Sequence, residues 1–136
     1  MRKILIVSHG ELAGGMQSAL ELITGADSGV VVLQAYVEEN RSVEEELAGL
    51  FGDGEEWVVF TDLLGGSITN QVLRTAAELG VMESVHIVAG MNLPLVIEVA
   101  MADPETPVME VLNEAIGMAR DQIAYVNQLI RNNNND

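Results

Sequence analysis

A chain of 136 residues suffices for one compact domain with a hydrophobic core and is too short for two. Apolar residues make up 49% of it, but they come in short blocks, none near the ~18 residues that a membrane-spanning helix needs. The formal charge of −15 argues against nucleic-acid binding and is compatible with a basic protein partner, while the lack of cysteine excludes disulfides. We therefore expect a soluble cytoplasmic protein with no direct membrane insertion.

Four short β-branched blocks, each flanked by turn-forming residues, predict strands that are buried on both faces. These blocks are Ile4–Val7, Val30–Leu33, Val58–Phe60 and Val85–Val88. Helical segments lie between them, so the connections are expected to be right-handed βαβ units. The sequence thus predicts an α/β fold, a single doubly wound domain with a four-stranded parallel sheet in the order 2-1-3-4.

Three amphipathic helices are predicted between these strands. Gly25 and Gly80 are expected to end the first and the third, and Ser42 with Glu45 has the spacing of a capping box at the start of the second. The inner faces are expected to hold Leu12, Met16, Ala19, Leu20 and Ile23 in the first helix, Val43, Leu47 and Leu50 in the second, and Ile68, Val72, Leu73, Ala76 and Leu79 in the third.

Two further helices are predicted after the fourth strand. Asn92 and Pro94 are typical of a helix start and predict a helix over Leu95–Ala102, which Pro104 ends. Pro107 then begins another helix. Its inner face is expected to hold Val108, Val111, Leu112, Ala115 and Ala119.

The C-terminal region is less regular. Over Gln122–Ile130 the helical period of apolar residues continues and alternation is poor, and the pattern leaves both helix and strand open. The asparagine-rich residues 132–136 are expected to form a disordered tail, so the folded domain is expected to span residues 1–131.

Two loops that follow neighbouring strands carry unusual polar residues. Ser8-His9-Gly10 follows the first strand, and a loop beginning Thr61-Asp62 follows the third. Ligands of open parallel sheets gather beyond the carboxyl ends of the strands, where the strand order reverses, so His9 and Asp62 are expected to face each other. By accepting the Nδ1 proton, Asp62 would leave Nε2 as a nucleophile. The structural alternative is a histidine whose nitrogens are satisfied by the backbone.

The second loop ends in Gly65-Gly66-Ser67, which is typical of a helix N-terminus. Backbone amides at a helix start form a ready site for phosphate oxygens. With His9 and Asp62 they would make a phosphoryl acceptor that needs no metal and no cofactor. The sequence lacks a P-loop, a carboxylate pair after the first strand and a dinucleotide fingerprint. A flavodoxin-like mononucleotide binder stays open on fold grounds.

Three motifs, "IVSHG", "TDLLGGSITN" and "VAGMNLPLVIEVAM", occur in this order. Together they resemble the IIA components of mannose-type (mannose/fructose/sorbose) sugar phosphotransferase systems, from about Lys3 into the final helical region. The resemblance implies a phosphotransferase in which His9 accepts a phosphoryl group from the phosphocarrier HPr and passes it to a IIB component. It also implies that Asp62 orients His9 and that Gly66 and Ser67 contact the phosphate.

The resemblance further implies a parallel α/β domain that forms a homodimer, with a fifth, antiparallel edge strand exchanged between subunits near the C-terminus. Two other roles stay open for His9: a regulatory phosphoacceptor module, or a relative of the dihydroxyacetone kinase phosphocarrier. His86, within the fourth strand, is expected to be structural, and Asn92 is expected to cap a helix.

Overall fold

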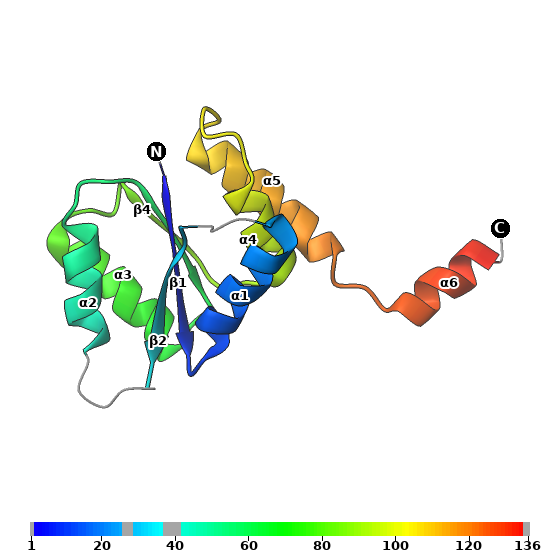
Figure 1. The fold of residues 1–136 in the computed structure, drawn as a ribbon, viewed down its shortest axis with the longest axis horizontal. Helices are drawn as coiled ribbons and strands as arrows, with labels where there is room; N and C mark the ends of the chain where they lie inside the picture. Colours follow the sequence, from blue (N-terminus) through cyan, green and yellow to red (C-terminus); the bar gives the residue numbers. More distant parts are fainter. Residues whose placement is uncertain (1, 26–28, 37–41, 135–136) are drawn as a thin grey trace.

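A four-stranded, all-parallel sheet forms the centre of the molecule (Figure 1). The computed structural model describes residues 2–25, 29–36 and 42–134. The strand order is β2-β1-β3-β4, which confirms the predicted fold class and order. The strands are β1 (Lys3–His9), β2 (Val31–Ala35), β3 (Trp57–Thr61) and β4 (Val85–Val88).

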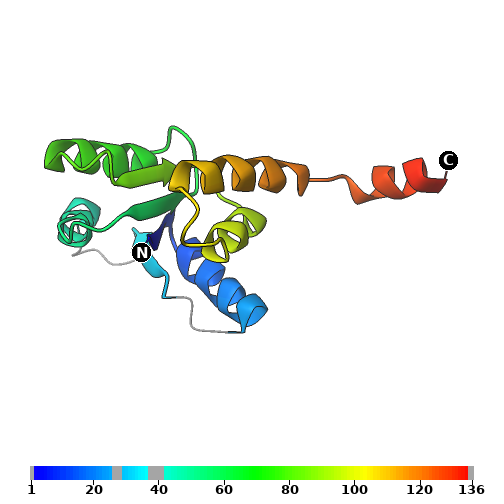
Figure 2. The same ribbon diagram turned by 90° about the horizontal axis from the view of Figure 1, so that it is seen from above.

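Helices cover both faces of the sheet, so the core has two layers (Figures 1 and 2). One layer joins alternate strand residues such as Ile6 and Phe60 to α1 (Leu12–Thr24), α4 (Leu93–Ala100) and α5 (Val108–Asp121). The other joins the intervening strand residues to α2 (Val43–Phe51) and α3 (Ser67–Leu79). Because successive strand side chains point to opposite faces, β-branched blocks that are apolar throughout supply both layers.

The single tryptophan of the chain lies in the second layer, at the first position of β3. Trp57 is 1% exposed, and its ring meets the Phe51 ring edge-on at a centroid distance of 6.2 Å. Its Nε1–H donates to Asp53 Oδ1 at 3.2 Å, and Lys3 pairs with Trp57 in the register of β1 and β3. This cluster anchors the amino-terminal edge of the sheet.

Helix ends follow the capping signals of the sequence. Gly25 and Gly80 end α1 and α3 with φ of 72° and 71°, as predicted. Ser42 Oγ accepts from the backbone N–H of Glu45 at 3.4 Å, which confirms it as the cap of α2.

The predicted start of α4 was two residues late. Asn92 Oδ1 accepts from the backbone N–H of Leu95 at 3.0 Å, and α4 spans Leu93–Ala100 rather than Leu95–Ala102. The cap bonds the third helical residue, so the helix begins directly after Asn92, and Pro94 occupies its first turn, where no N–H is needed.

Four residues predicted for inner helix faces are exposed instead, so the predicted apolar stripes were too wide. In α1 the buried residues are Ala13 and Leu20, which places the contact face to one side of the predicted stripe. A short helix on a twisted sheet buries a narrow stripe and leaves its flanks to solvent. The exposed residues are Leu12, Ile23, Leu73 and Leu79.

The C-terminal segment extends away from the domain and ends in α6 (Val126–Asn134), as both ribbon views show (Figures 1 and 2). The structure therefore resolves the open 122–130 segment as mostly helix, and the implied edge strand is not formed among the described residues. The helix also continues past residue 131, since no glycine or proline stops it. Residues 135 and 136 of the expected tail lie outside the described residues. No helix in the described ranges has the length and apolar character needed to cross a membrane.

Candidate functional site

Strand register brings the two predicted loops together at the carboxyl edge of the sheet. His9, the last residue of β1, pairs with Ala35 of β2, while Val7 pairs with Thr61 of β3. The backbone N–H of Gly10 donates to the Ala35 carbonyl at 3.0 Å, which turns the chain out of the sheet directly after His9. Since Asp62 follows the last residue of β3, it lies beside His9 as predicted.

Buried polar contacts fix the turn that carries His9. Ser8 is fully buried, and its Oγ accepts from the backbone N–H of Ala13 at 2.8 Å, so it caps the first turn of α1 from within β1. Gly14 donates its N–H to Gln34 Oε1 at 3.0 Å, and a Cβ at Gly14 would lie only 2.6 Å from that oxygen. The start of α1 is therefore packed tightly against β2.

His9 and Asp62 make two hydrogen bonds that share one carboxylate oxygen. Asp62 Oδ2 accepts from the backbone N–H of His9 at 2.7 Å and lies 2.8 Å from its Nδ1. The side chain of Asp62 is 9% exposed, whereas that of His9 is 42% exposed. An Nδ1–H donor matches this geometry, and Nε2 of the ring then has no hydrogen-bond partner among the described residues. This nitrogen belongs to a partly exposed ring and could be reached by an incoming group.

The pKa of Asp62 lies below its ordinary value of 3.8. Burial is the largest single influence and acts to raise the pKa of this carboxyl group. The hydrogen bonds from the backbone and the ring of His9, together with the ring's charge, outweigh burial and lower it. Asp62 is accordingly an ionised hydrogen-bond acceptor at neutral pH.

The N-terminus of α3 lies directly beside the His9 ring. A Cβ added at Gly66 would lie 3.9 Å from His9 Cε1 and 3.3 Å from Leu63 Cβ, so the close approach depends on glycine. The backbone N–H of Gly66 makes a long 3.4 Å bond to the Leu63 carbonyl. By contrast, the N–H of Ser67 has no acceptor among the described residues. Of the two predicted amides, that of Ser67 is therefore the freer one.

A hydroxyl pair holds the loop between Asp62 and α3. Thr61 is fully buried, and its Oγ1 lies 2.7 Å from the Oγ1 of Thr69, which in turn donates to the Leu63 carbonyl. The Thr61 carbonyl also accepts from the N–H of Met91 at 3.1 Å, which ties the end of β3 to the loop after β4. These bonds keep the carboxylate and the helix end in fixed relation to His9.

Tyr36 also belongs to this site, and the sequence analysis missed it. It follows β2 directly, and its ring centroid is 5.7 Å from that of His9. Its hydroxyl oxygen lies 3.2 Å from Ser67 Oγ. Tyr36 has a φ of 66°, and no other described residue except glycine has a positive φ. Its position could have indicated a place in the site, because Tyr36 directly follows the strand next to β1, on the same edge of the sheet as His9.

His86 and Asn92 lie outside this arrangement. His86 pairs with Val58 of β3, and Val58 pairs with Ile4, so His86 sits near the opposite edge of the sheet from His9. Its Nε2 is 3.5 Å from Glu56 Oε2. Asn92, besides capping α4, donates its side-chain N–H to the Ala119 carbonyl at 3.2 Å. Asn92 is thus the helix cap that the sequence predicts, whereas the buried Nε2 of His86 makes no hydrogen bond with the described residues, and a structural role for His86 stays a prediction.

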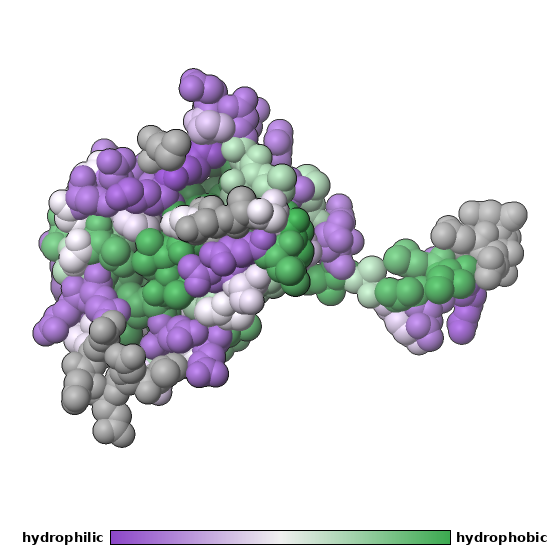
Figure 3. Space-filling view, viewed as in Figure 1, coloured by the Kyte–Doolittle hydropathy of each residue, from purple (hydrophilic) through white to green (hydrophobic). Residues whose placement is uncertain are grey.

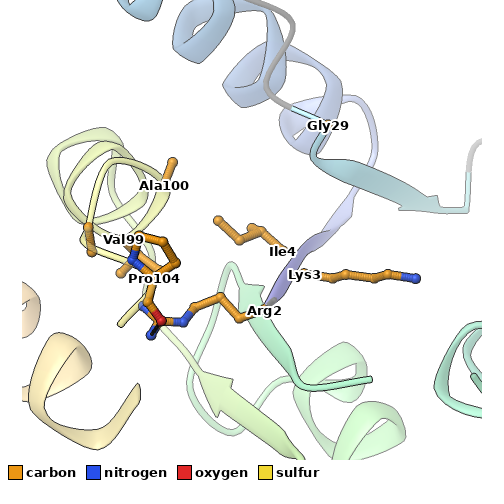
Figure 4. A pocket seen from close by; sticks show the side chains of 8 residues that line it. Arg2, Lys3, Ile4, Gly29, Val99, Ala100 and Pro104 are labelled. Atoms are coloured by element: carbon orange, nitrogen blue, oxygen red, sulfur yellow. Dashed lines mark hydrogen bonds between the residues drawn. The ribbon is translucent and has the colours of Figure 1, made fainter. Parts of the chain in front are cut away.

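A pocket of about 350 Å³ lies at the amino-terminal edge of the sheet, also away from His9 (Figure 4). The Arg2 guanidinium bonds the backbone carbonyls of Pro104 and Thr106, which ties the start of β1 to the loop between α4 and α5. Lys3 points out of the pocket toward Asp53, 2.8 Å away. Among the described residues, no group of three or more histidine, aspartate and glutamate side chains is placed to hold a metal ion.

Solved structures share this fold over almost its whole length. A candidate phosphoenolpyruvate-dependent sugar phosphotransferase system (PTS) permease from Klebsiella pneumoniae is 31% identical with a TM-score of 0.84, and the alignment covers 95% of this chain and 93% of that one. The PTS component EIIA from Streptococcus agalactiae is 26% identical with a TM-score of 0.78, over 94% of this chain and 99% of that one. The mannose/sorbose-specific PTS IIA subunit from Enterococcus faecalis, at 22% identity, shares the fold with a TM-score of 0.74, over 91% and 93%. These similarities place the chain in the class of PTS components.

Residues 3–116 match the EIIA-man family, described as the PTS system fructose IIA component. The chain belongs to this family of IIA components of sugar phosphotransferase systems. No match was found among curated proteins.

Proposed function

We propose that this chain is a phosphohistidine carrier, which accepts a phosphoryl group from HPr on His9 and passes it to a IIB component during sugar uptake and phosphorylation. The observation that carries the proposal is the pair of hydrogen bonds, 2.7 and 2.8 Å, that joins His9 to Asp62 Oδ2. Membership in a PTS IIA family supports it. A carrier that exchanges phosphoryl groups with HPr would work in the cytoplasm.

In the proposed transfer, Nε2 of His9 forms a bond to phosphorus as the phosphorus–nitrogen bond of the HPr donor breaks. The electron pair of the broken bond returns to the donor ring. Because Nδ1 keeps its proton, the His9 ring becomes positively charged, and the Asp62 carboxylate stabilises that charge. One phosphorus–nitrogen bond replaces another, so the free energy of transfer is close to zero. The protein therefore contributes mainly by positioning the reacting groups. Transfer to IIB repeats the step with His9 as the donor.

The N-terminus of α3 would bind the phosphoryl oxygens. The N–H of Ser67, which has no acceptor within the described part of the chain, can donate to an oxygen, and the N–H of Gly66 can exchange its long turn bond for a stronger, charge-assisted one. The partial positive charge of the helix N-terminus adds to this attraction. The group would thus be held between Nε2 of His9 and the first turn of α3.

The surface around His9 would receive HPr and IIB. Leu63 and Leu64, directly after Asp62, are 58% and 86% exposed, and Leu12 on the adjacent helix is 50% exposed. Exposed apolar side chains around a reactive group are typical of a protein-binding surface. The charge of −15 would speed the approach of a partner whose contact surface is basic.

The C-terminal segment would pair two copies into a homodimer. Apolar residues gather on one side of this segment and polar residues on the other (Figure 3). A free helix of this length is marginal in water, so its apolar side is expected to pack against a second subunit. The exposed apolar residues there are Ile123, Tyr125, Val126, Leu129 and Ile130.

Intact-mass measurement after incubation with phosphoenolpyruvate, enzyme I and HPr tests the proposed acceptor. We expect a mass gain of one phosphoryl group that is lost in acid, because phosphohistidine is acid-labile. His9→Ala should abolish the gain, and the control His86→Ala should leave it unchanged. A label that persists in His9→Ala, or that resists acid, would overturn the proposal.

Onward transfer is tested separately by adding membranes that hold the cognate IIB and permease components with radiolabelled phosphoenolpyruvate. We expect the label to reach the sugar, and to do so only when His9 is present. Labelled His9 without transfer to any IIB component or sugar would instead show a regulatory phosphoacceptor.

A further inference from the structure

Tyr36 is placed beside His9 by the register of the sheet. Ala35, the last residue of β2, pairs with His9 and accepts from the N–H of Gly10, so the next residue of the chain emerges next to the imidazole. The two rings lie 5.7 Å apart between centroids, with their planes inclined by 30°. Tyr36 therefore contacts the His9 ring from the side of β2, opposite the neighbouring strand that leads to Asp62.

The hydroxyl group of Tyr36 connects β2 to α3 across the site. Its oxygen lies 3.2 Å from Ser67 Oγ, at the first residue of α3. The adjacent Gly66 is the point at which α3 approaches Cε1 of His9, the ring carbon bonded to both nitrogens. Nδ1 of His9 faces Asp62, so the contact between Tyr36 and Ser67 joins β2 to the helix end that lies against the Cε1 side of the ring.

Tyr36 adopts a backbone conformation that is unfavourable for tyrosine. Its φ of 66° lies in the left-handed region, where bulky side chains are genuine outliers and glycine or asparagine is normal. The residue is 68% exposed, so core packing does not explain the choice of an aromatic residue. A strained residue in contact with a reactive group indicates a role in function rather than in stability.

We propose that Tyr36 is a positioning residue, which holds the His9 ring against Asp62 and limits the access of water to the phosphorylated Nε2. This inference rests on the proposed function, because it assumes that His9 carries a phosphoryl group. In hydrolysis, a water oxygen bonds to phosphorus, and the phosphorus–Nε2 bond breaks with its electron pair left on Nε2. The water's protons stay with the released phosphate or pass to solvent. The Tyr36 ring, 5.7 Å from the His9 ring and fixed through Ser67, narrows the approach of that water.

The lifetime of the phosphorylated protein tests this role, with phosphoramidate as the phosphoryl donor so that no protein partner is needed. His9 Nε2 bonds to the phosphorus of phosphoramidate, whose nitrogen leaves with the electron pair and takes a proton. After the donor is removed, loss of label is followed by intact mass in native protein, Tyr36→Phe, Tyr36→Gly and the control Met101→Gly. Met101 is a matched control because it is 67% exposed and lies at the end of α4, between two residues that line the pocket at the amino-terminal edge of the sheet.

We expect Tyr36→Gly to shorten the half-life of the label by about two- to tenfold, the effect of one lost contact on a barrier. Tyr36→Phe keeps the ring but loses the link to Ser67, so its half-life should lie between those of the native protein and the glycine variant. Met101→Gly should match the native protein. The midpoint of thermal unfolding of Tyr36→Gly should be unchanged or higher, because glycine accepts a positive φ. A purely structural role would lower it.

The outcomes separate this inference from the proposed function. Equal half-lives in native protein, Tyr36→Phe and Tyr36→Gly would overturn the role of Tyr36 and leave His9 as acceptor. A longer half-life in Tyr36→Gly, or a shortened one only together with a lowered unfolding midpoint, would overturn it as well. Failure of His9 to take label from either phosphoramidate or HPr would overturn the proposed function itself and the role of Tyr36 with it.

Discussion

At the scale of single residues, one oxygen atom sets two properties of His9. Asp62 Oδ2 accepts from the backbone N–H, which fixes where the residue lies, and lies beside Nδ1, which fixes how the ring is turned. The same contacts hold the pKa of Asp62 below its ordinary value against the opposing effect of burial. Position, orientation and charge are thus coupled through a single carboxylate.

Replacing Asp62 by asparagine should separate the position of His9 from the orientation and charge of its ring. The amide oxygen can still accept from the backbone of His9, so we expect the fold to persist. An amide carries no charge to stabilise the reacting ring, and its NH₂ group can hold the imidazole in the wrong tautomer. Asp62→Asn should slow phosphoryl transfer from HPr by about 10²–10³-fold, as measured by rapid quench. The control Asp121→Asn makes the same charge change at the exposed last residue of α5 and should transfer at the native rate. A native rate for Asp62→Asn would refute the orienting role of Asp62.

Acid should weaken the fold through the same residue. The pKa of Asp62 is lower in the folded protein than its ordinary value of 3.8, so the ionised carboxylate stabilises the folded state above about that pH. As pH falls below 3.8 and through the lowered folded pKa, this contribution is lost.

Urea unfolding from pH 7 to pH 3 should therefore show a gap in unfolding free energy between native protein and Asp62→Asn that is constant near neutral pH and narrows in acid. The Asp121→Asn variant corrects for the lost charge alone. A gap that widens on acidification would contradict the assigned direction of the pKa shift.

At the scale of elements, two helix starts build the site, and they do so differently. The start of α1 is bound by a buried hydroxyl, Ser8 Oγ, and contributes stability. The start of α3 has no side-chain cap from the described residues, and among them the N–H of Ser67 beside His9 has no acceptor. A capped helix end and an uncapped one thus flank the same histidine, and only the uncapped end is available to an anion.

Removing the Ser67 hydroxyl should affect transfer less than changing Asp62. In Ser67→Ala the backbone N–H that would contact the phosphoryl group survives, and the bond to Tyr36 is lost. We expect rapid-quench transfer from HPr to slow by about two- to tenfold, the effect of one neutral hydrogen bond. A loss as large as that of Asp62→Asn would mean that the hydroxyl itself carries the main contact with phosphate.

Removing the Ser8 hydroxyl should affect stability. Ser8→Ala would leave the N–H of Ala13 buried without its acceptor, which should lower the free energy of unfolding by about 1–2 kcal/mol in urea titrations. Ser18→Ala, an exposed change on the same helix, serves as the control and should have little effect. Equal stabilities of the two variants would show that the buried cap is not stabilising.

Much of this arrangement is predictable from the sequence because it depends on local patterns. β-branched blocks gave the strands, and the order 2-1-3-4 placed Asp62 next to His9. Tyr36 could not be predicted in the same way, since a positive φ at a tyrosine contradicts its intrinsic preference. The segment 122–130 was ambiguous because its apolar period suits a helix whose partner surface is not encoded locally. Tertiary contacts decide such positions, and short patterns do not record them.

At the scale of the whole molecule, a compact acidic domain carries an amphipathic extension. The charge of −15 opposes the association of two like domains, so a dimer must gain its stability from apolar contact rather than from charge. The extension offers that contact at the far end of α5, where the chain leaves the domain (Figure 1).

Light scattering should find the intact protein at the mass of a dimer. A chain that ends at Arg120 lacks α6 and the exposed apolar residues before it, so we expect it to be monomeric and folded. Leu129→Asp in the intact chain places a charge on the apolar side of α6 and should weaken the dimer without shortening the protein. An intact chain that is monomeric at every concentration tested would refute the proposed assembly.

The position of Trp57 determines what its fluorescence can report. Trp57 pairs with Lys3, and His9 lies six residues further along β1, about 20 Å away at the usual rise per residue of a strand. The indole is buried against Phe51 at the amino-terminal edge of the sheet, so its emission should change strongly when the core is exposed to solvent. Phosphorylation at the carboxyl edge should leave it almost constant. The protein therefore carries an intrinsic optical probe of unfolding that is insensitive to its own chemistry.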